Sequence, residues 1–147
     1  MSVIVIEKAS APQQTKNLMK RILIADDDPL VRQALRSILE FKGYECEDVE
    51  NGALALAWLE HHHADLVILD NQMPVLEGID CLIQLKKSRE HRLLPVIILT
   101  GNLDESVQAR AFAAGALHVF AKPLDCGVFL DAVSESLTAQ EPQAGDE

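Results

Sequence analysis

Short apolar runs alternate along this chain with longer segments in which apolar residues recur at helical spacing. Each run is bounded by charged or turn-forming residues, which is typical of a buried or edge strand. Pro29 suits the first turn of a helix and Asn51 suits a helix N-cap, while Gly43 and Gly115 suit helix ends. The sequence predicts strands at residues 21–25, 44–49, 65–69, 95–99 and 117–121, and helices at residues 29–42, 52–59, 79–85, 104–114 and 125–138.

Five consecutive strand–helix units predict a parallel sheet with helices on both faces. Parallel strands need crossover connections, and these are right-handed, so each helix packs back onto the sheet. The expected architecture is an α/β three-layer sandwich of the (βα)5 type. In such sheets ligands bind outside the carboxyl ends of the strands.

Acidic, hydroxyl and amino groups follow the predicted strands and gather at that edge of the sheet. Because clustered carboxylates repel one another, several ionised carboxylates in one cleft require a cation. Magnesium takes oxygen ligands and keeps some of its waters, so it suits Asp27 and Asp70 better than zinc does. The groups are Asp26, Asp27 and Asp28 after the first strand, Asp70 after the third, Thr100 after the fourth and Lys122 after the fifth.

These groups suit phosphoryl transfer. With a metal bound, the Asp70 carboxylate stays ionised at neutral pH and attacks phosphorus to form an aspartyl phosphate. The transition state carries its charge on three equatorial oxygens, for which Lys122 supplies a cation and Thr100 a hydroxyl donor. Pro123 follows Lys122 directly, so a cis peptide bond is expected between them.

Composition narrows the class of protein. The chain has 147 residues, 48% of them apolar, which is enough for one globular domain with a core. Its formal net charge of -10 repels nucleic acid, so direct DNA binding is not expected. No stretch approaches the roughly 20 apolar residues that cross a membrane. The run at residues 3–6 is too short for a secretion signal, so a cytoplasmic protein is expected.

Three further features have simple structural interpretations. Asp28, directly before Pro29, suits a helix N-cap. The histidines at 61–63 are consecutive and cannot all face one metal ion, and they suit the end of a helix. The three cysteines are odd in number and widely spaced, which predicts neither a disulfide framework nor a zinc site: Cys46, Cys81 and Cys126.

Five motifs together resemble the receiver domain of two-component response regulators, of the chemotaxis-receiver type. The resemblance covers residues 21 to about 137 and implies a flavodoxin-like fold with strand order 2-1-3-4-5, an order that the pattern alone does not give. The motifs, in this order and spacing, are ILIADDDPLVRQAL, DLVILDNQMP with a later glycine, PVIILTG, AGA and AKP.

The resemblance implies a metal site and a phosphorylation site. Asp70 matches the phosphoacceptor of the family. Asp26 and Asp27 match the acidic pair that holds Mg²⁺, Asp27 directly and Asp26 through water. The backbone carbonyl of Gln72 matches a further metal ligand.

The switch residues match the family with one departure. Thr100 matches the hydroxyl that swings toward the phosphoryl group, and Lys122 matches the lysine paired with it. In much of the family the position three before the lysine is aromatic, and its ring moves inward with the threonine. That position is Val119 here, and Phe120 follows it on the opposite face of the strand. The departure concerns this coupling and leaves the phosphorylation site intact.

The implied function is a stand-alone phosphorylation switch rather than an enzyme. A histidine kinase or a histidine phosphotransfer protein supplies the phosphoryl group, and Asp70 later loses it to water. Output is expected through protein contact at the surface formed by residues 104–114, 117–121 and 125–138, while homodimerisation stays open. Residues 1–20 are expected to form a flexible arm, residues 21–138 the receiver domain and residues 139–147 a disordered tail.

Two other functions compete with this one. A phosphohydrolase of the haloacid-dehalogenase type also uses magnesium and an aspartate nucleophile, here Asp26, and ILIADDDPLV and IILTGN resemble two of its motifs. That family needs a further acidic pair after a later strand, and it leaves Asp70 unexplained. A pseudo-receiver used only for protein contacts is disfavoured because every reactive position is present.

Overall fold

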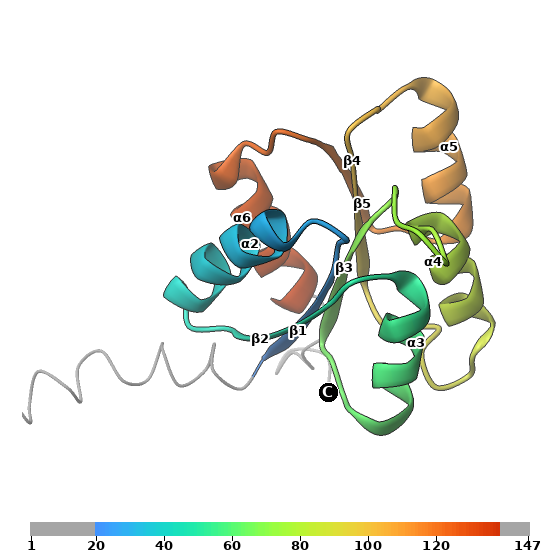
Figure 1. The fold of residues 1–147 in the computed structure, drawn as a ribbon, viewed down its shortest axis with the longest axis horizontal. Coiled ribbons are helices and arrows are strands. Elements are labelled where there is room, and N and C mark those ends of the chain that lie inside the picture. Colours follow the sequence, from blue (N-terminus) through green and yellow to red (C-terminus); the bar gives the residue numbers. More distant parts are fainter. Residues whose placement is uncertain (1–19, 139–147) are drawn as a thin grey trace, which may run out of the picture.

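A computed structural model describes residues 20–138 and shows strands and helices in strict alternation (Figure 1). Every strand and helix predicted from the sequence is present, with ends that differ by one or two residues from the predicted ones. The predicted arm and tail lie outside the described residues, except for Lys20. The elements are β1 (Arg21–Ala25), α2 (Pro29–Phe41), β2 (Glu45–Val49), α3 (Gly52–His61), β3 (Leu66–Asp70), α4 (Gly78–Lys87), β4 (Val96–Thr100), α5 (Glu105–Ala114), β5 (His118–Ala121) and α6 (Cys126–Thr138).

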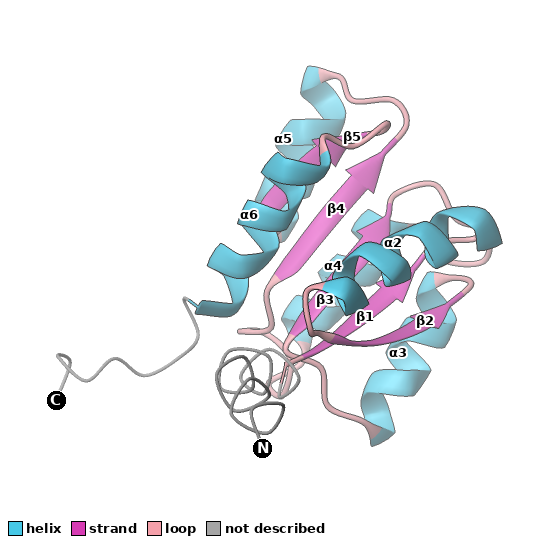
Figure 2. Cartoon of the chain, turned by 90° about the vertical axis from the view of Figure 1, so that its left-hand side faces the viewer, coloured by secondary structure: helices cyan, strands magenta, loops and turns pink. Residues whose placement is uncertain are grey.

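The strands form a parallel sheet in the order β2-β1-β3-β4-β5 (Figure 2). This is the 2-1-3-4-5 order of the flavodoxin-like fold, so the order implied by the resemblance is confirmed. Strands β1, β3 and β4 are almost wholly buried because helices cover both faces, which explains their continuous apolar runs. Strand β2 lies at an edge and carries exposed residues, as its alternating sequence predicts.

The helices divide the core into two halves on opposite faces of the sheet. Helices α2 and α6 cover one face, and α3, α4 and α5 cover the other (Figure 1). Successive residues of β1 point to opposite faces, so Ile22 and Ile24 pack in the first half while Leu23 packs in the second. Val119 and Phe120 divide in the same way, which confirms that the valine and the aromatic ring lie on opposite faces of β5.

The register of the sheet aligns the ends of its strands. Ala25 at the end of β1 pairs with Leu69, which directly precedes Asp70 in β3. Thr100 at the end of β4 pairs with Ala121 at the end of β5. The polar residues that end or follow these strands are therefore neighbours along one edge of the sheet.

Local signals of the sequence explain where the helices begin and end. The Asp28 carboxylate caps α2 by accepting the N–H of Leu30 at 2.9 Å, which confirms its predicted role as a cap. Asn51 caps α3 in the same way. Gly115 ends α5 with φ of 112°, a conformation that glycine adopts without steric cost.

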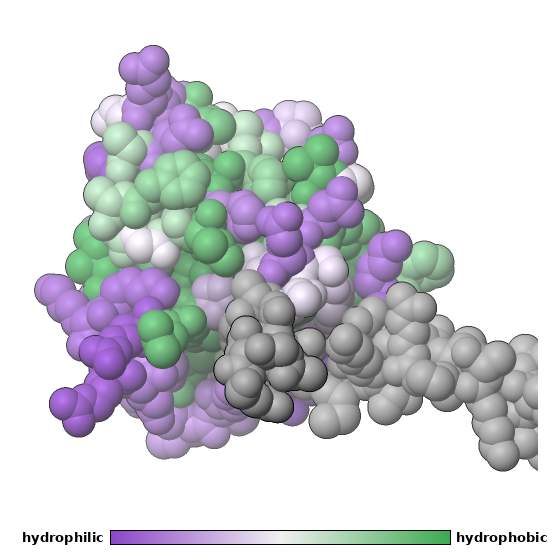
Figure 3. All heavy atoms as spheres, turned by 180° about the vertical axis from the view of Figure 1, so that it is seen from behind, coloured by the Kyte–Doolittle hydropathy of each residue, from purple (hydrophilic) through white to green (hydrophobic). Residues whose placement is uncertain are grey.

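The structure also describes the surface and the three cysteines. No helix within residues 20–138 has the length and apolar character needed to cross a membrane. Hydrophobic and hydrophilic side chains are interleaved over the face shown in Figure 3. Cys46 and Cys81 are buried free thiols, and burial raises the pKa of each to about 12. Cys126 is a free thiol at the surface.

Candidate functional site

Three aspartate side chains meet at the carboxyl edge of the sheet. Asp26 and Asp27 directly follow β1, and Asp70 is the last residue of the neighbouring strand β3. One carboxylate oxygen of each residue lies within 4.8 Å of the other two. Asp26 and Asp70 are 1% and 3% exposed, whereas Asp27 is exposed to solvent. The cluster thus combines two desolvated acids with one that faces water.

Lys122 reaches this cluster from the end of β5. Its Nζ atom lies 2.9 Å from Oδ2 of Asp26 and 3.0 Å from Oδ1 of Asp70. Burial lowers the pKa of the lysine, but hydrogen bonding and attraction to the two carboxylates outweigh it, so the pKa of Lys122 is raised and the ammonium is retained. The peptide bond between Lys122 and Pro123 is cis, as the sequence predicts.

The electrostatics of Asp70 set it apart from an ordinary surface acid. Burial and the nearby charge of Asp26 raise the pKa of Asp70, while Lys122 and the backbone N–H of Gln72 lower it only in part. Its Oδ1 atom forms an ion pair with Lys122 but lacks a hydrogen bond of good geometry within the described residues. A buried acceptor without a hydrogen bond is costly, so this oxygen is poised to accept a further partner.

The donor set of the cluster fits a hard divalent cation. Three carboxylates face one ammonium, so two negative charges are left uncompensated when all four groups are ionised. The ligands are all oxygens, which suit Mg²⁺, Ca²⁺ or Mn²⁺ rather than a soft metal. The Oδ1 atom of Asp70, which pairs with Lys122 but lacks a well-formed hydrogen bond, supplies an acceptor that a cation would satisfy. The acidic cluster is therefore able to bind a divalent metal ion.

Thr100 and Gln72 lie beside the cluster without joining its ion pairs. Thr100 is 1% exposed, and its hydroxyl accepts the N–H of Asn102 at 3.2 Å. Its carbonyl accepts the N–H of Lys122 at 2.9 Å, which ties the end of β4 to the residue after β5. Gln72 lies in the loop after β3, with an exposed side chain and with its backbone N–H bonded to Asp70.

Gly78 positions Asp70 in a way that the sequence analysis did not anticipate. A Cβ atom at this position would lie 2.5 Å from the carbonyl oxygen of Asp70 and 2.9 Å from Cα of Asn71. The Gly78 N–H donates to the Asn71 carbonyl, and the Asn71 side chain accepts the N–H of Ile79. The loop thus folds back against the Asp70 backbone, and only glycine allows the approach. The glycine that follows the DLVILDNQMP motif was the available signal in the sequence.

Arg32 also contacts the site and was missed in the sequence. Its Nη1 atom donates to the carbonyl oxygen of Asp26 at 2.7 Å, and its Nε atom donates to Asp48 of β2 at 2.8 Å. The arginine belongs to the first motif, ILIADDDPLVRQAL, but helical spacing alone places it on a polar face of α2. Only the folded structure shows that the Arg32 side chain points toward the site.

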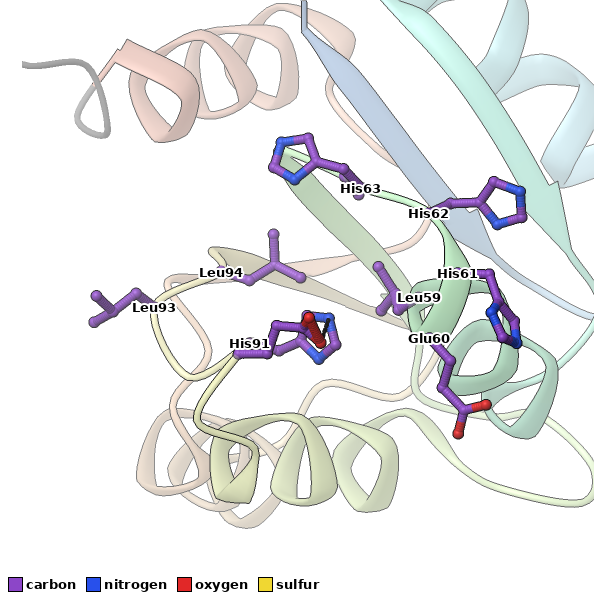
Figure 4. Close-up of a pocket in the computed structure, with 10 residues that line it drawn as sticks. Leu59, Glu60, His61, His62, His63, His91, Leu93 and Leu94 are labelled. Atoms are coloured by element: carbon purple, nitrogen blue, oxygen red, sulfur yellow. Dashed lines mark ion pairs between the residues drawn. The ribbon is translucent and has the colours of Figure 1, made fainter.

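A second cluster of titratable groups lines a pocket at the opposite, amino edge of the sheet (Figure 4). The pocket has a volume of about 440 Å³. His63 lies 2.9 Å from Asp65, and the ring of His62 stacks on Trp58. No group of three possible metal ligands within residues 20–138 includes a histidine. Figure 4 shows the imidazole rings spread around the pocket.

Comparisons with known proteins agree with the fold and the cluster. Residues 22–134 match the response regulator receiver domain. Response regulator MprA of Mycobacterium sp. (strain KMS) is 34% identical over 125 residues, which cover 85% of this chain and 54% of that protein. The chain thus spans about half the length of the curated relatives it matches.

Solved structures show the same architecture. The signal receiver domain of a histidine kinase from Syntrophus aciditrophicus superposes with a TM-score of 0.78 at 32% identity, covering 85% of this chain and 96% of that one. The receiver domain of sensor histidine kinase PA1611 from Pseudomonas aeruginosa, which has a magnesium ion coordinated in its active site cleft, shares the fold at 24% identity and a TM-score of 0.75, covering 81% and 98%. On the family match and the shared architecture, this chain belongs to the response regulator receiver domain family of two-component signalling.

Proposed function

We propose that this chain is a phosphoacceptor switch of a two-component phosphorelay, with Asp70 as the residue that is phosphorylated. The phosphoryl donor is a phosphohistidine on a histidine kinase or a histidine phosphotransfer protein. The observation that carries the proposal is the state of the Asp70 carboxylate, which is buried, held 3.0 Å from the Lys122 ammonium and left with an oxygen that accepts no hydrogen bond within the described residues.

The acidic cluster suits the metal that this reaction needs. Asp26, Asp27 and Asp70, together with the carbonyl oxygen of Gln72, would hold Mg²⁺. When bound, the ion supplies positive charge to the carboxylates and to the phosphoryl oxygens. The PA1611 receiver domain, which has the same fold and holds magnesium in its cleft, supports this choice of ion.

The side chains around Asp70 suit the transfer itself. An Asp70 oxygen attacks phosphorus as the bond between phosphorus and the donor imidazole nitrogen breaks, and the nitrogen keeps the electron pair. The Lys122 ammonium already lies 3.0 Å from Asp70, so it is placed to attract the phosphoryl oxygens. The Thr100 hydroxyl accepts from Asn102 and keeps its own proton available as a donor. Attack of water on phosphorus then breaks the bond to the Asp70 oxygen, which releases inorganic phosphate and returns the free carboxylate.

The same geometry argues against Asp26 as the nucleophile of a dehalogenase-type phosphohydrolase. Its Oδ1 atom accepts the N–H of Asp28 at 2.9 Å, and its Oδ2 atom accepts from Lys122 at 2.9 Å. Both oxygens are therefore engaged in a side chain that is 1% exposed, whereas Oδ1 of Asp70 has the ion pair with Lys122 but no well-formed hydrogen bond in the described structure.

Output through the face formed by α5, β5 and α6 is part of the proposal. Phe112, Leu117 and Val128 are between 46% and 54% exposed on these elements and their connection, and they offer apolar contact area to a protein partner. Phosphorylation shifts the population of conformations only if the phosphoryl group interacts better with one of them. Because Val119 replaces the usual aromatic residue, the shift on this face proceeds without an aromatic ring at that position.

Incubation with acetyl phosphate and Mg²⁺, followed by intact mass measurement, tests this function. Wild type is expected to gain one phosphoryl group per chain, while Asp70→Asn gains none and wild type in EDTA gains none. Turnover of phosphomonoesters that survives Asp70→Asn but not Asp26→Asn would select the phosphohydrolase instead. A wild-type chain that gains no phosphoryl group in magnesium, from acetyl phosphate or from a phosphohistidine donor, would select the pseudo-receiver.

A further inference from the structure

The loop between β1 and α2 carries two of the three acids of the cluster and is held by a few directed contacts. The Asp26 N–H donates to the carbonyl of Val49 at 3.1 Å. The Asp26 carbonyl accepts from Arg32 at 2.7 Å, and this carbonyl belongs to the peptide unit that joins Asp26 to Asp27. The orientation of that peptide unit sets where both carboxylates leave the backbone.

Arg32 is braced on its other side by the edge strand of the sheet. Its side chain is 16% exposed, and its Nε atom lies 2.8 Å from Oδ2 of Asp48. The other oxygen of Asp48 pairs with Arg36, one turn further along α2. A continuous set of contacts therefore runs from β2 through Arg32 to the peptide unit between Asp26 and Asp27.

We infer that Arg32 is a positioning residue for the metal-binding acids, and that Asp48 is the group that orients it. This inference rests on the proposed function of the acidic cluster as a Mg²⁺ site. Arg32 contacts the backbone of the loop rather than the carboxylates, so it acts on the metal site through the placement of Asp26 and Asp27.

The chemistry of the guanidinium explains why arginine suits this position. Its donors lie in a rigid plane, so the bond to Asp48 fixes the direction of the bond to the Asp26 carbonyl. Asp48 also neutralises a positive charge that would otherwise oppose cation binding nearby. A lysine is a flexible point charge and cannot hold both acceptors in one fixed geometry.

Mg²⁺ affinity of the full chain, measured by titration calorimetry, tests the inference. We expect Arg32→Gln to raise the Kd for Mg²⁺ about tenfold, within the range found when groups behind metal ligands are removed. Arg32→Lys is expected to recover part of this loss. Arg36→Gln is the matched control, because it removes a guanidinium that pairs with the same Asp48 but has no contact with the loop, and its Kd is expected to equal that of wild type.

A second measurement reports on the loop without any metal. Hydrogen–deuterium exchange in EDTA is expected to be faster at the amides of residues 26–28 in Arg32→Gln than in wild type or Arg36→Gln. Thermal melts in EDTA verify that each variant is folded. Should Arg32→Gln fail to fold, Asp48→Ala keeps the arginine, removes the acceptor that orients it, and is expected to weaken Mg²⁺ binding and loosen the same amides.

The outcomes separate the inference from the function on which it rests. Wild type that binds no Mg²⁺ overturns the metal site and with it both proposals. Wild type that binds Mg²⁺ while a folded Arg32→Gln matches it in Kd and in exchange overturns only the positioning role. Equal weakening in Arg36→Gln also overturns that role, because it would assign the effect to the charge of α2 as a whole.

Discussion

The two polar clusters at opposite edges of the sheet have similar numbers of titratable groups but different physical character. At the carboxyl edge, the oxygens of three aspartates lie within 4.8 Å of one another, and two of these residues are buried. At the amino edge, the histidines line a pocket of about 440 Å³, and His62, His63 and His91 each contact a different residue. The pocket at the amino edge therefore has no converging set of ligands.

The difference shows that convergence and desolvation, rather than concavity, distinguish the candidate site. Burial raises the pKa of Asp70, and a fixed amine lies beside it. The side chain of His63 is 80% exposed, so water screens its ion pair with Asp65. An acid whose pKa is perturbed by burial, next to a specific charge partner, is a candidate for a functional site.

The largest expected effect is that of Gly78→Ala, which disrupts the loop behind Asp70. A Cβ atom 2.5 Å from the Asp70 carbonyl oxygen forces the backbone apart. We expect a loss of about 3 kcal/mol in the free energy of unfolding, at the upper end of overpacking costs. Urea denaturation with circular dichroism measures it.

Gly127→Ala is the matched control for this substitution. Gly127 lies in α6, where an added Cβ would lie 3.5 Å from Oδ1 of Asp125, an ordinary van der Waals contact. Alanine favours helix by up to about 1 kcal/mol, so this variant is expected to be as stable as wild type or more so. Equal losses in both variants would contradict a special approach at Gly78.

The next largest effect is the pH dependence of the free energy of unfolding, which follows from the raised pKa of Asp70. The folded protein without metal holds the Asp70 proton more tightly than the unfolded chain does. Stability conferred by this group is therefore present below the ordinary pKa of an aspartate and is lost as pH rises through the raised value. Asp70→Asn lacks this loss, so in EDTA its stability relative to wild type is expected to grow with pH across that window.

The rate at which the stability of Asp70→Asn, relative to wild type, rises with pH has a fixed upper limit. A single titrating group changes the free energy of unfolding by at most about 1.4 kcal/mol per pH unit. Urea denaturation of both proteins at a series of pH values measures the difference, with Asp27→Asn, an exposed acid of the same cluster, as the comparison. Parallel curves for wild type and Asp70→Asn would refute the desolvation of Asp70.

A smaller effect is expected at Val75, in the loop between Asp70 and α4. Val75 has φ of 70° and is 80% exposed, so a β-branched residue holds a left-handed conformation without burying its side chain. Val75→Asn is expected to raise the free energy of unfolding by about 1 kcal/mol, because asparagine tolerates this region. Val75→Thr keeps the β-branch and is the control. A loss of stability in the asparagine variant would contradict strain at this residue.

The smallest effect is expected in the histidine pocket. Replacing His61 and His63 together by alanine removes two exposed rings that share no ligand, so the free energy of unfolding is expected to change by no more than about 0.5 kcal/mol. Mg²⁺ affinity and phosphoryl uptake are expected to be unchanged. A clear loss of either would show that the two edges of the sheet are coupled.

Much of this protein was predictable from local sequence. Apolar runs and helical spacing gave the alternating strands and helices, and Asp28, Asn51 and Gly115 fixed helix ends through their own side chains or backbone. The polar residues at the ends of the predicted strands identified the acids, the hydroxyl and the amine of the candidate site. All of these signals act within a few residues, so periodicity and capping reveal them.

Other features depended on contacts between distant segments. Lys122 and Asp26 are 96 residues apart in sequence, and their 2.9 Å contact exists only because β1, β3, β4 and β5 are ordered as they are. The approach of Gly78 to Asp70 and the bond from Arg32 to Asp26 also needed the fold. Sequence determined which chemical groups the chain carries at the ends of its strands. Tertiary structure decided which of these groups meet and how far each is desolvated. Charge interactions and pKa values depend on distance and desolvation, and both are set by the residues that pack around a group.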